Sequence, residues 1–169
     1  MGIHHRGNWD LERHQQFSGE DISYSDPQTG EKYLPWDIET SAGVDRSLLF
    51  LLIDAYNEEK DRIVLKLDPK LAPYKVAVFP LLANKPELIK LARSVYDNLR
   101  PQFMTAWDDR GNIGKRYYSQ DEIGTPFCVT IDFDSLEDKK VTVRSRDTMK
   151  QERVSISKLE EYFKDKLDV

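Results

Sequence analysis

The pattern of hydrophobic and polar residues divides the chain into an irregular first part and a regular second part. In the first part, a short polar helix is predicted at residues 10–17, and the turn signal at 26–30 predicts a hairpin between two short extended segments. The hairpin leads into a strand at 37–40. These segments hold few apolar side chains, so we expect the first part to need a partner surface.

The longest apolar run, residues 48–53, fits either a buried strand or a buried helix. We interpret it as a helix, because Ala55 and Tyr56 continue the run and two polar residues stand near its start. A turn at 41–43 separates this helix from the preceding strand.

Arg46 is placed against local preference, because a cation in the first turn of a helix opposes the helix dipole. An anion held at this point would satisfy both the arginine and the free backbone N–H groups of the first turn. The alternative is an ordinary ion pair of Arg46 with Asp45 or with another nearby carboxylate. The local pattern leaves both interpretations open.

Residues 74–169 follow a β-α-β-α-β-β-α pattern, which predicts an α/β domain with a mixed sheet flanked by helices. The predicted strands are 74–79, 103–107, 125–133 and 140–144, and the predicted helices are 85–100, 113–122 and a last one that a capping box opens at 157–160. Asp-Pro and Ala-Pro pairs break regular secondary structure just before this domain. We therefore place a linker at 63–73, between domains at 1–62 and 74–169.

The composition indicates a soluble globular protein, with 33% charged and 39% hydrophobic residues. The net charge of −5 argues against sequence-blind binding of nucleic acids but allows a local basic patch. One cysteine excludes an internal disulfide framework, and neither a membrane-length apolar run nor a signal peptide is evident. The histidines lack a zinc-like spacing. We expect a cytoplasmic protein without a metal site or a membrane partner.

Residues 39–46, Glu-Thr-Ser-Ala-Gly-Val-Asp-Arg, together with the apolar helix after them, resemble motif 3 of the class II aminoacyl-tRNA synthetases. Within that class they are most similar to the homodimeric glycyl-tRNA synthetases. Residues 71–81, 113–130 and 141–147 are similar to the anticodon-binding domain of the same family. Because several long segments match one family in order, the resemblance covers essentially the whole chain.

The resemblance implies that residues 1–62 are the C-terminal part of an antiparallel-sheet catalytic domain and that residues 74–169 form the anticodon-binding domain. Segments corresponding to motifs 1 and 2 are missing, so we expect a C-terminal fragment of a longer homodimeric enzyme that is inactive alone. The implied reaction is the ATP-dependent attachment of glycine to its tRNA through glycyl-adenylate, with Mg²⁺ accompanying the ATP.

The resemblance also implies roles for the residues of motif 3. The catalytic residue is expected to be Arg46, which would stabilise phosphate charge as it shifts. The implied glycine-binding residues are Glu39, Thr40, Ser41, Ala42 and Gly43, and the implied ATP-binding residues are Gly43, Val44, Asp45 and Arg46. The alternatives are that Glu39 pairs with a nearby base and that the 41–43 segment only shapes a turn.

Residues 115–118 place two cations and two aromatic rings in one helical turn. Unpaired RNA bases stack on such rings and on arginine, and cations hold the RNA backbone. Asp121 or Glu122 can accept a hydrogen bond from the amino group of cytosine, and glycine anticodons end in two cytosines. The expected tRNA-binding residues are Lys115, Arg116, Tyr117 and Glu122. The alternative is a solvated helix with internal ion pairs.

A second class of function stays open at the level of the sequence. Domains that resemble anticodon-binding domains also occur in non-catalytic RNA-binding and polymerase-accessory proteins. The presence of Glu39, Gly43 and Arg46 favours the synthetase. The partners expected for a synthetase are glycine, ATP, glycine tRNA and a second copy of the full-length enzyme.

Overall fold

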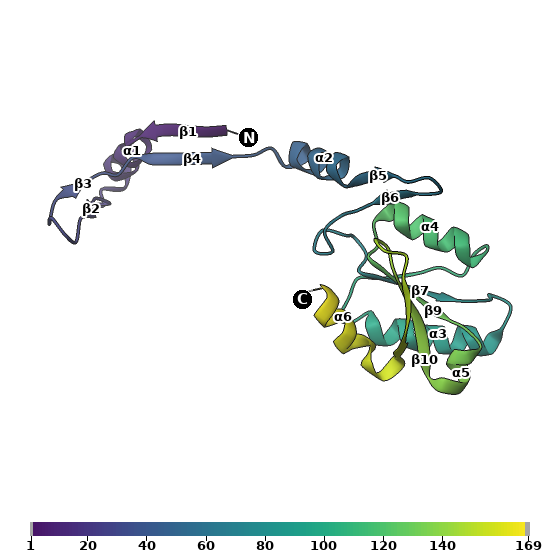
Figure 1. The fold of residues 1–169 in the computed structure, drawn as a ribbon. Coiled ribbons are helices and arrows are strands. Elements are labelled where there is room, and N and C mark those ends of the chain that lie inside the picture. Colours follow the sequence, from purple (N-terminus) through teal and green to yellow (C-terminus); the bar gives the residue numbers. More distant parts are fainter. Residues whose placement is uncertain (1, 168–169) are drawn as a thin grey trace. The chain divides into compact units, whose positions relative to one another are not determined.

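The computed structural model describes residues 2–167, and its internal contacts divide the chain into two units, Met1–Phe50 and Leu51–Val169 (Figure 1). The division lies inside helix α2 (Val44–Ala55), whereas the sequence pattern places a linker at 63–73. Of the helices in the described range, none is both long enough and apolar enough to cross a membrane.

The first unit is built on an antiparallel ribbon of two strands, the first and the last of the unit. Its elements before α2 are β1 (Gly2–Gly7), α1 (Trp9–Ser18), β2 (Tyr24–Ser25), β3 (Lys32–Tyr33) and β4 (Asp37–Ser41). Strands β2 and β3 pair antiparallel, which confirms the hairpin predicted from the turn at 26–30. None of residues 2–50 is buried, so this unit has no hydrophobic core of its own.

Helix α2 confirms that the apolar run at 48–53 is helical. The run is exposed rather than buried, however, with Phe50 61% and Ile53 63% exposed, and Ala55 is the buried residue of this helix. A contiguous apolar surface of this kind marks a contact surface in a soluble protein, because its exposure to water is unfavourable.

The second unit is organised around a five-stranded mixed sheet with the strand order β11-β10-β9-β7-β8. Strand β7 pairs in parallel with β8 and β9, and the remaining neighbours are antiparallel. The strands are β7 (Val76–Pro80), β8 (Thr105–Trp107), β9 (Phe127–Ile131), β10 (Lys140–Ser145) and β11 (Gln151–Ser155). The helices are α3 (Pro86–Leu99), α4 (Ile113–Ile123), α5 (Asp134–Asp138) and α6 (Leu159–Leu167). The predicted α/β class with a mixed sheet is confirmed.

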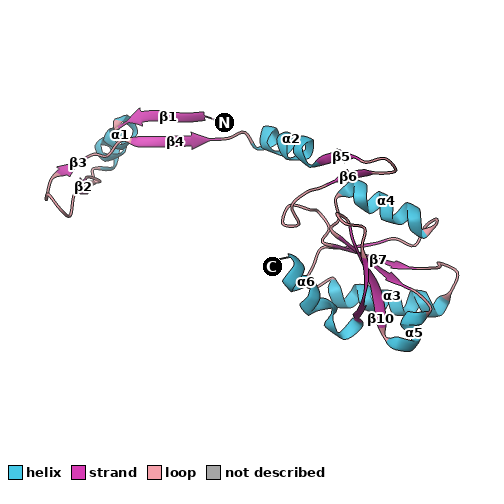
Figure 2. Ribbon diagram, viewed as in Figure 1, coloured by secondary structure: helices cyan, strands magenta, loops and turns pink. Residues whose placement is uncertain are grey.

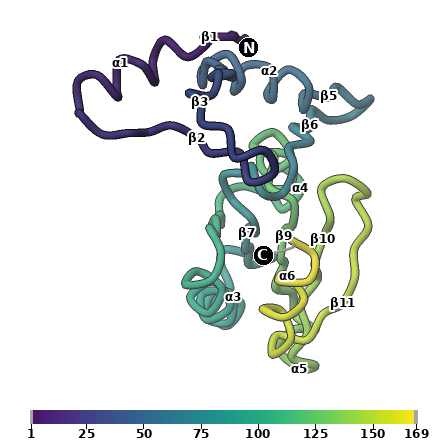
Figure 3. Tube along the Cα trace, turned by 90° about the vertical axis from the view of Figure 1, so that its left-hand side faces the viewer, coloured from purple at the N-terminus to yellow at the C-terminus, as the bar shows by residue number. Residues whose placement is uncertain are grey.

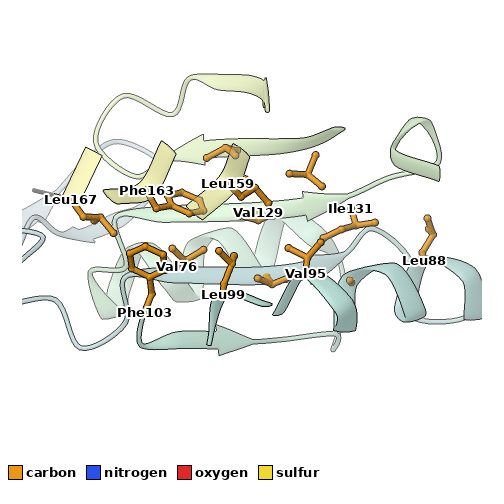
Figure 4. Close-up of a cluster of buried hydrophobic side chains, with 14 residues drawn as sticks. Val76, Leu88, Val95, Leu99, Phe103, Val129, Ile131, Leu159, Phe163 and Leu167 are labelled. Atoms are coloured by element: carbon orange, nitrogen blue, oxygen red, sulfur yellow. The ribbon is translucent and has the colours of Figure 1, made fainter. Parts of the chain in front are cut away.

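Helices α3 and α6 cover one face of the sheet, and α4 covers the other (Figure 2). Successive side chains of residues 127–131 point to opposite faces of the sheet, and this alternation decides which of them packs against which helix. Val129 and Ile131 join the larger core with α3 and α6 (Figure 4), while Cys128 faces α4 beside Phe79. Cys128 is 1% exposed, and burial raises the pKa of its thiol, so Cys128 acts as a small core residue.

Three local predictions for this domain differ from the structure. Residues 134–138, which connect two predicted strands, form the short helix α5, which was not predicted. Strand β11 was not predicted, because its residues are mostly polar and lie at the edge of the sheet. The capping box predicted at 157–160 does not form, because a 3₁₀ turn (Ile156–Lys158) precedes α6 and the Ser157 hydroxyl bonds that of Ser155 at 3.0 Å.

The segment expected as a linker is a packed part of the second unit. Strands β5 (Tyr56–Glu58) and β6 (Ile63–Leu65) form an antiparallel hairpin, and β6 lies against α4 (Figure 3). Val64 is fully buried. After the hairpin the chain makes a turn before it enters β7. The ammonium group of Lys75 donates to three carbonyl oxygens of this turn, those of Pro69, Lys70 and Ala72, at 2.7, 3.0 and 2.9 Å. These bonds fix the path of the chain into β7.

Candidate functional site

Helix α4 carries all the residues that the sequence suggested for RNA binding. It begins where the Asn112 side chain accepts the Lys115 backbone N–H at 2.9 Å, and it ends at Gly124, whose φ of +88° suits glycine. Its helical period separates two stripes of side chains. The inner stripe is Ile113, Arg116, Tyr117, Gln120 and Asp121, and the outer stripe is Lys115, Tyr118, Ser119 and Glu122.

Arg116 belongs to the inner stripe and is only 2% exposed. Its guanidinium donates to four backbone carbonyl oxygens, those of Pro80, Asp109, Arg110 and Gly111, at 2.6, 3.3, 3.0 and 2.8 Å. The surface position expected from the sequence is therefore wrong. Arg116 instead holds the loop after β8 against the end of β7, so its contribution to an RNA surface is to shape that loop.

Tyr117 also points inward. Its hydroxyl group shares a hydrogen bond of 2.5 Å with the Thr130 hydroxyl, and its ring packs edge-on against Phe79 at 5.7 Å. Burial raises the pKa of Tyr117. The exposed ring of this turn is that of Tyr118, which is 45% exposed. Of the two tyrosines, Tyr118 is therefore the one available to stack on a base.

Asp121 is fully buried and is bonded to two arginines, so it does not offer a free acceptor to cytosine. Glu122 and Lys115 both lie on the exposed outer stripe. The structure thus brings Lys115, Tyr118 and Glu122 together on one face and withdraws Arg116, Tyr117 and Asp121 from it. Among the described residues, neither Lys115 nor Glu122 forms the ion pair inside the helix that the alternative interpretation expects.

A groove lies between α4 and the edge strand β8, with a volume of about 420 Å³. Aromatic side chains and a charged loop border it, and its lining includes Tyr74, Tyr96, Trp107, Asp108, Arg110 and Ser119. The Arg93 guanidinium lies 3.7 Å from the centre of the Trp107 ring, and the indole N–H of Trp107 is buried without a hydrogen-bond partner in the described structure. Aromatic rings at the border of a groove suit a planar ligand such as a nucleobase.

Sequence reasoning missed this groove because its residues come from four separate segments. Two signals were available: Trp107 ends a predicted strand, and the loop directly after it carries Asp108 and Arg110. Loops at the carboxyl ends of parallel strands commonly carry binding residues. Neither signal says that Tyr74 and Tyr96 lie beside them, since that follows from the packing of α3 against the sheet.

Replacing Arg116 with alanine should lower the free energy of unfolding by about 2–3 kcal/mol, because four backbone carbonyl oxygens, one of them buried, lose a charged donor. Urea unfolding of the purified chain measures this loss. The matched control is Arg110→Ala, since the Arg110 side chain is 91% exposed and its removal should change stability by no more than about 0.5 kcal/mol. Equal stability of the two variants would contradict the structural role of Arg116.

In the segment that resembles motif 3, β4 holds Glu39 and Thr40 opposite His4 and Ile3 of β1. The Glu39 carboxylate accepts from the Arg6 guanidinium at 3.2 Å, so the alternative of a strand carboxylate paired with a base is realised in this structure. Both side chains are more than two-fifths exposed, which makes this a weak pair that a ligand ammonium group can displace.

The turn after β4 leads into the start of α2. Residues 40–46 are all exposed, and the Ser47 N–H donates to the Gly43 carbonyl at 3.0 Å to close the first turn of α2. Within the described range, the Arg46 guanidinium makes no ion pair or hydrogen bond, with Asp45 or any other carboxylate. Arg46 is thus a solvated cation beside a helix N-terminus, a placement that suits an incoming phosphate.

Comparison with known proteins gives matches to both units. Residues 75–166 match the family described as the anticodon binding domain. Glycine–tRNA ligases of Caldanaerobacter subterraneus subsp. tengcongensis and Borreliella burgdorferi are 52% and 54% identical over 98% and 96% of this chain, and that of Thermobifida fusca is 50% identical over 98%. The chain spans 36–38% of the length of these relatives. The family match covers more than half of the sequence, and the chain therefore belongs to the anticodon binding domain family.

Proposed function

We propose that the chain is part of a glycine–tRNA ligase, in which the 74–169 domain binds the anticodon end of glycine tRNA and residues 1–62 supply motif 3 of the catalytic domain. The observation that carries this proposal is the identity of about half the residues with glycine–tRNA ligases over almost the whole chain, including both units. A non-catalytic binding protein would have no reason to keep the motif 3 residues.

The catalytic half of the proposal rests on the turn between β4 and α2. The ligase forms glycyl-adenylate from glycine and ATP with release of pyrophosphate, and then transfers glycine to the tRNA. Glu39 and Ser41 would hold the glycine ammonium group, and the 41–43 turn would exclude larger side chains. Arg46 would bind the ATP phosphates, with Gly43 to Asp45 lining the nucleotide.

The exposed apolar side chains of α2 support the same proposal. A helix whose residues 48–53 are all exposed needs a covering surface, and the remaining part of a catalytic domain would provide it. The full-length ligase is proposed to be a cytoplasmic homodimer. Residues 2–167 hold no group of three His, Cys, Asp or Glu side chains able to bind a metal, so Mg²⁺ is proposed only as the ion that accompanies ATP.

The RNA-binding half rests on the outer stripe of α4 and the groove beside it. Lys115 would contact phosphate, Tyr118 would stack on a base, and Glu122 would accept from a cytosine amino group. The aromatic groove would receive a second unstacked base. Arg116 and Tyr117 would act on RNA only through the loop and the helix that they hold in place.

The chain should bind glycine tRNA with a strong dependence on salt, because phosphate contacts release counterions. Lys115→Ala should weaken binding of every RNA tested and reduce the slope of log affinity against log salt by about 1. Glu122→Ala should instead erode the preference for cytosine, at a cost of about 1–3 kcal/mol in discrimination. The measurement is a titration with glycine tRNA and with an anticodon-swapped tRNA at several salt concentrations.

The matched controls are Lys90→Ala and Glu87→Ala, which remove the same charges from exposed positions of α3, on the opposite face of the sheet. These variants should bind both tRNAs as the parent chain does. If the two tRNAs bind equally well and the α4 variants behave like the α3 controls, α4 is a solvated helix and does not read the anticodon.

A further inference from the structure

A second groove lies on the face of the sheet that α6 covers, away from α4. It is formed by β9, β10, the β10–β11 turn, β11 and α6, and it has a volume of about 390 Å³. We call it the α6 groove, and its lining includes Phe127, Ser145, Thr148, Lys150, Tyr162 and Lys166. The volume lies within the range of small-molecule sites in proteins.

The inner wall of the α6 groove is aromatic and apolar. Val143 is 2% exposed, and the partly buried rings of Phe127 and Tyr162 pack edge-on with their centres 6.3 Å apart. The fully buried Phe163 packs against both rings, at 5.6 Å from Phe127 and 5.2 Å from Tyr162. A wall of this kind favours a planar ligand, because another ring gains packing contacts with it.

Two cations in the lining of the groove have no carboxylate partner. Among residues 2–167, neither the Lys150 nor the Lys166 ammonium group forms an ion pair, although the chain has 30 acidic and 25 basic residues. The Lys166 ammonium group instead lies 5.9 Å from the centre of the Tyr162 ring. Two lysines beside one groove attract an anion, and lysine is a common binder of phosphate.

Glu152 also lines the groove, but it does not neutralise these lysines. Its Oε1 accepts from the Tyr162 hydroxyl. Burial and the Glu152 carboxylate raise the pKa of Tyr162, so the hydroxyl keeps its proton and stays a donor. The other oxygen of Glu152 can accept from a ligand amino group, whereas a ligand carboxylate beside it would be repelled. The groove therefore suits a ligand with a phosphate at one end and a neutral ring that carries an amino group at the other.

The β10–β11 turn holds its polar groups in fixed positions. The Ser145 N–H donates to the Lys150 carbonyl and the Met149 N–H donates to the Ser145 carbonyl, both at 3.0 Å. Met149 has a φ of +55°, which a residue with a side chain adopts only where the surrounding bonds hold it. The Thr148 hydroxyl accepts the Lys150 N–H at 3.3 Å, so its own proton is available to a ligand oxygen. The turn thus presents a hydroxyl and an ammonium group to the groove without further ordering.

We propose that the α6 groove is a nucleotide-binding site, in which the base packs on Phe127 and Tyr162 and the phosphate contacts Lys150 and Lys166. Glu152 accepts from the amino group of the base, which favours adenine or cytosine. The groove shares no residue with α4 or with the segment that resembles motif 3, so the site does not depend on the proposed ligase function. A free mononucleotide and one nucleotide of an RNA chain both present a base and a phosphate, and the site accepts this shared chemistry.

The test is a titration of the purified chain with AMP, measured by calorimetry and by backbone amide NMR shifts. AMP should bind about tenfold more tightly than adenosine or inorganic phosphate, because each of these makes only part of the contacts. The shifts should centre on the β10–β11 turn and α6. The double variant Lys150→Ala with Lys166→Ala should weaken AMP binding about tenfold or more, since it removes two charge-assisted contacts, and should leave the weak binding of adenosine unchanged.

The matched control is the double variant Lys140→Ala with Lys164→Ala, which removes one exposed lysine from β10 and one from α6, both outside the groove. It should bind AMP as the parent chain does. A titration with glycine tRNA separates the two sources of the nucleotide. If the groove variant also loses affinity for tRNA, the site holds a nucleotide of the RNA, and if only AMP binding falls, it holds a free nucleotide.

Four results would overturn the nucleotide site. The first two are no measurable binding of AMP, and AMP binding that persists unchanged in the groove variant. The third is inorganic phosphate binding as tightly as AMP, since the lysines would then act without the aromatic wall. The fourth is displacement of AMP by an equal concentration of a tetraglutamate peptide, which would make the groove a surface for acidic proteins.

Discussion

Arg46→Ala in the full-length ligase should reduce kcat for glycyl-adenylate formation by about 10²-fold or more, the scale of losing one electrostatic stabiliser of a transition state. Arg46 is exposed and forms no ion pair in the described structure, so its removal breaks no internal contact and the folded state should be unaffected. The effect should therefore appear in catalysis and not in the thermal midpoint. Glycine-dependent ATP–pyrophosphate exchange measures it.

Two further variants make this test specific. Arg46→Lys keeps a cation but loses the fork that binds two phosphate oxygens, so it should retain an intermediate activity. Lys60→Ala removes an exposed cation from the turn after β5 and should leave exchange unchanged. Near-normal turnover of Arg46→Ala would mean that this arginine is a solvated surface cation and that motif 3 binds phosphate through other groups.

Asp121→Ala should lower the free energy of unfolding by about 3–5 kcal/mol, the cost of leaving a buried charge without its partner. The loss should lie at the upper end of this range, because two buried cations, Arg62 and Arg144, lose the carboxylate that separates them. For a domain of about 100 residues the thermal midpoint should fall by about 12 °C or more. Urea unfolding and thermal scans of the purified chain measure both quantities.

The contrasting variant is Asp138→Ala, which removes a carboxylate that pairs with Arg153 but is 41% exposed. Exposed pairs of this kind contribute about 0–1 kcal/mol, so its effect should be small. A double-mutant cycle of Asp121 with Arg62 gives the free energy of the pair itself. If Asp121→Ala proves no more destabilising than Asp138→Ala, the two arginines find other acceptors and the network contributes little to stability.

Sequence reasoning correctly placed the elements in which the spacing of apolar residues along the chain matches the spacing of the buried side chains. Helix α3 buries Leu88, Ala92, Val95 and Leu99, and β9 alternates between the two cores, so both follow directly from spacing. Strand β11 and the β5–β6 hairpin were missed because their stability comes from pairing and packing with distant segments. The proline-rich stretch before β7 was expected as a linker, although lysine and backbone bonds order it.

The sequence proposed α4 as the RNA-binding helix, but it did not show which of the proposed residues the fold leaves exposed. The helical period of α4 was already visible in the sequence, with positions 113, 116, 117, 120 and 121 on one stripe. That stripe carries Arg116 and Asp121, and charges are expected outside unless their partners are known. The partners are the Pro80 carbonyl and Arg62, both distant in sequence, so the pattern within the helix could not reveal them.

The place of Cys128 under α4 gives the protein a built-in reporter of its own opening. It is the chain's one cysteine, it is 1% exposed, and its thiol is held protonated by burial. A thiol-modifying reagent can therefore react only with molecules in which α4 has lifted or the sheet has opened. The ratio of the modification rate in the native chain to that in urea gives the fraction of molecules opened at Cys128, without an engineered label.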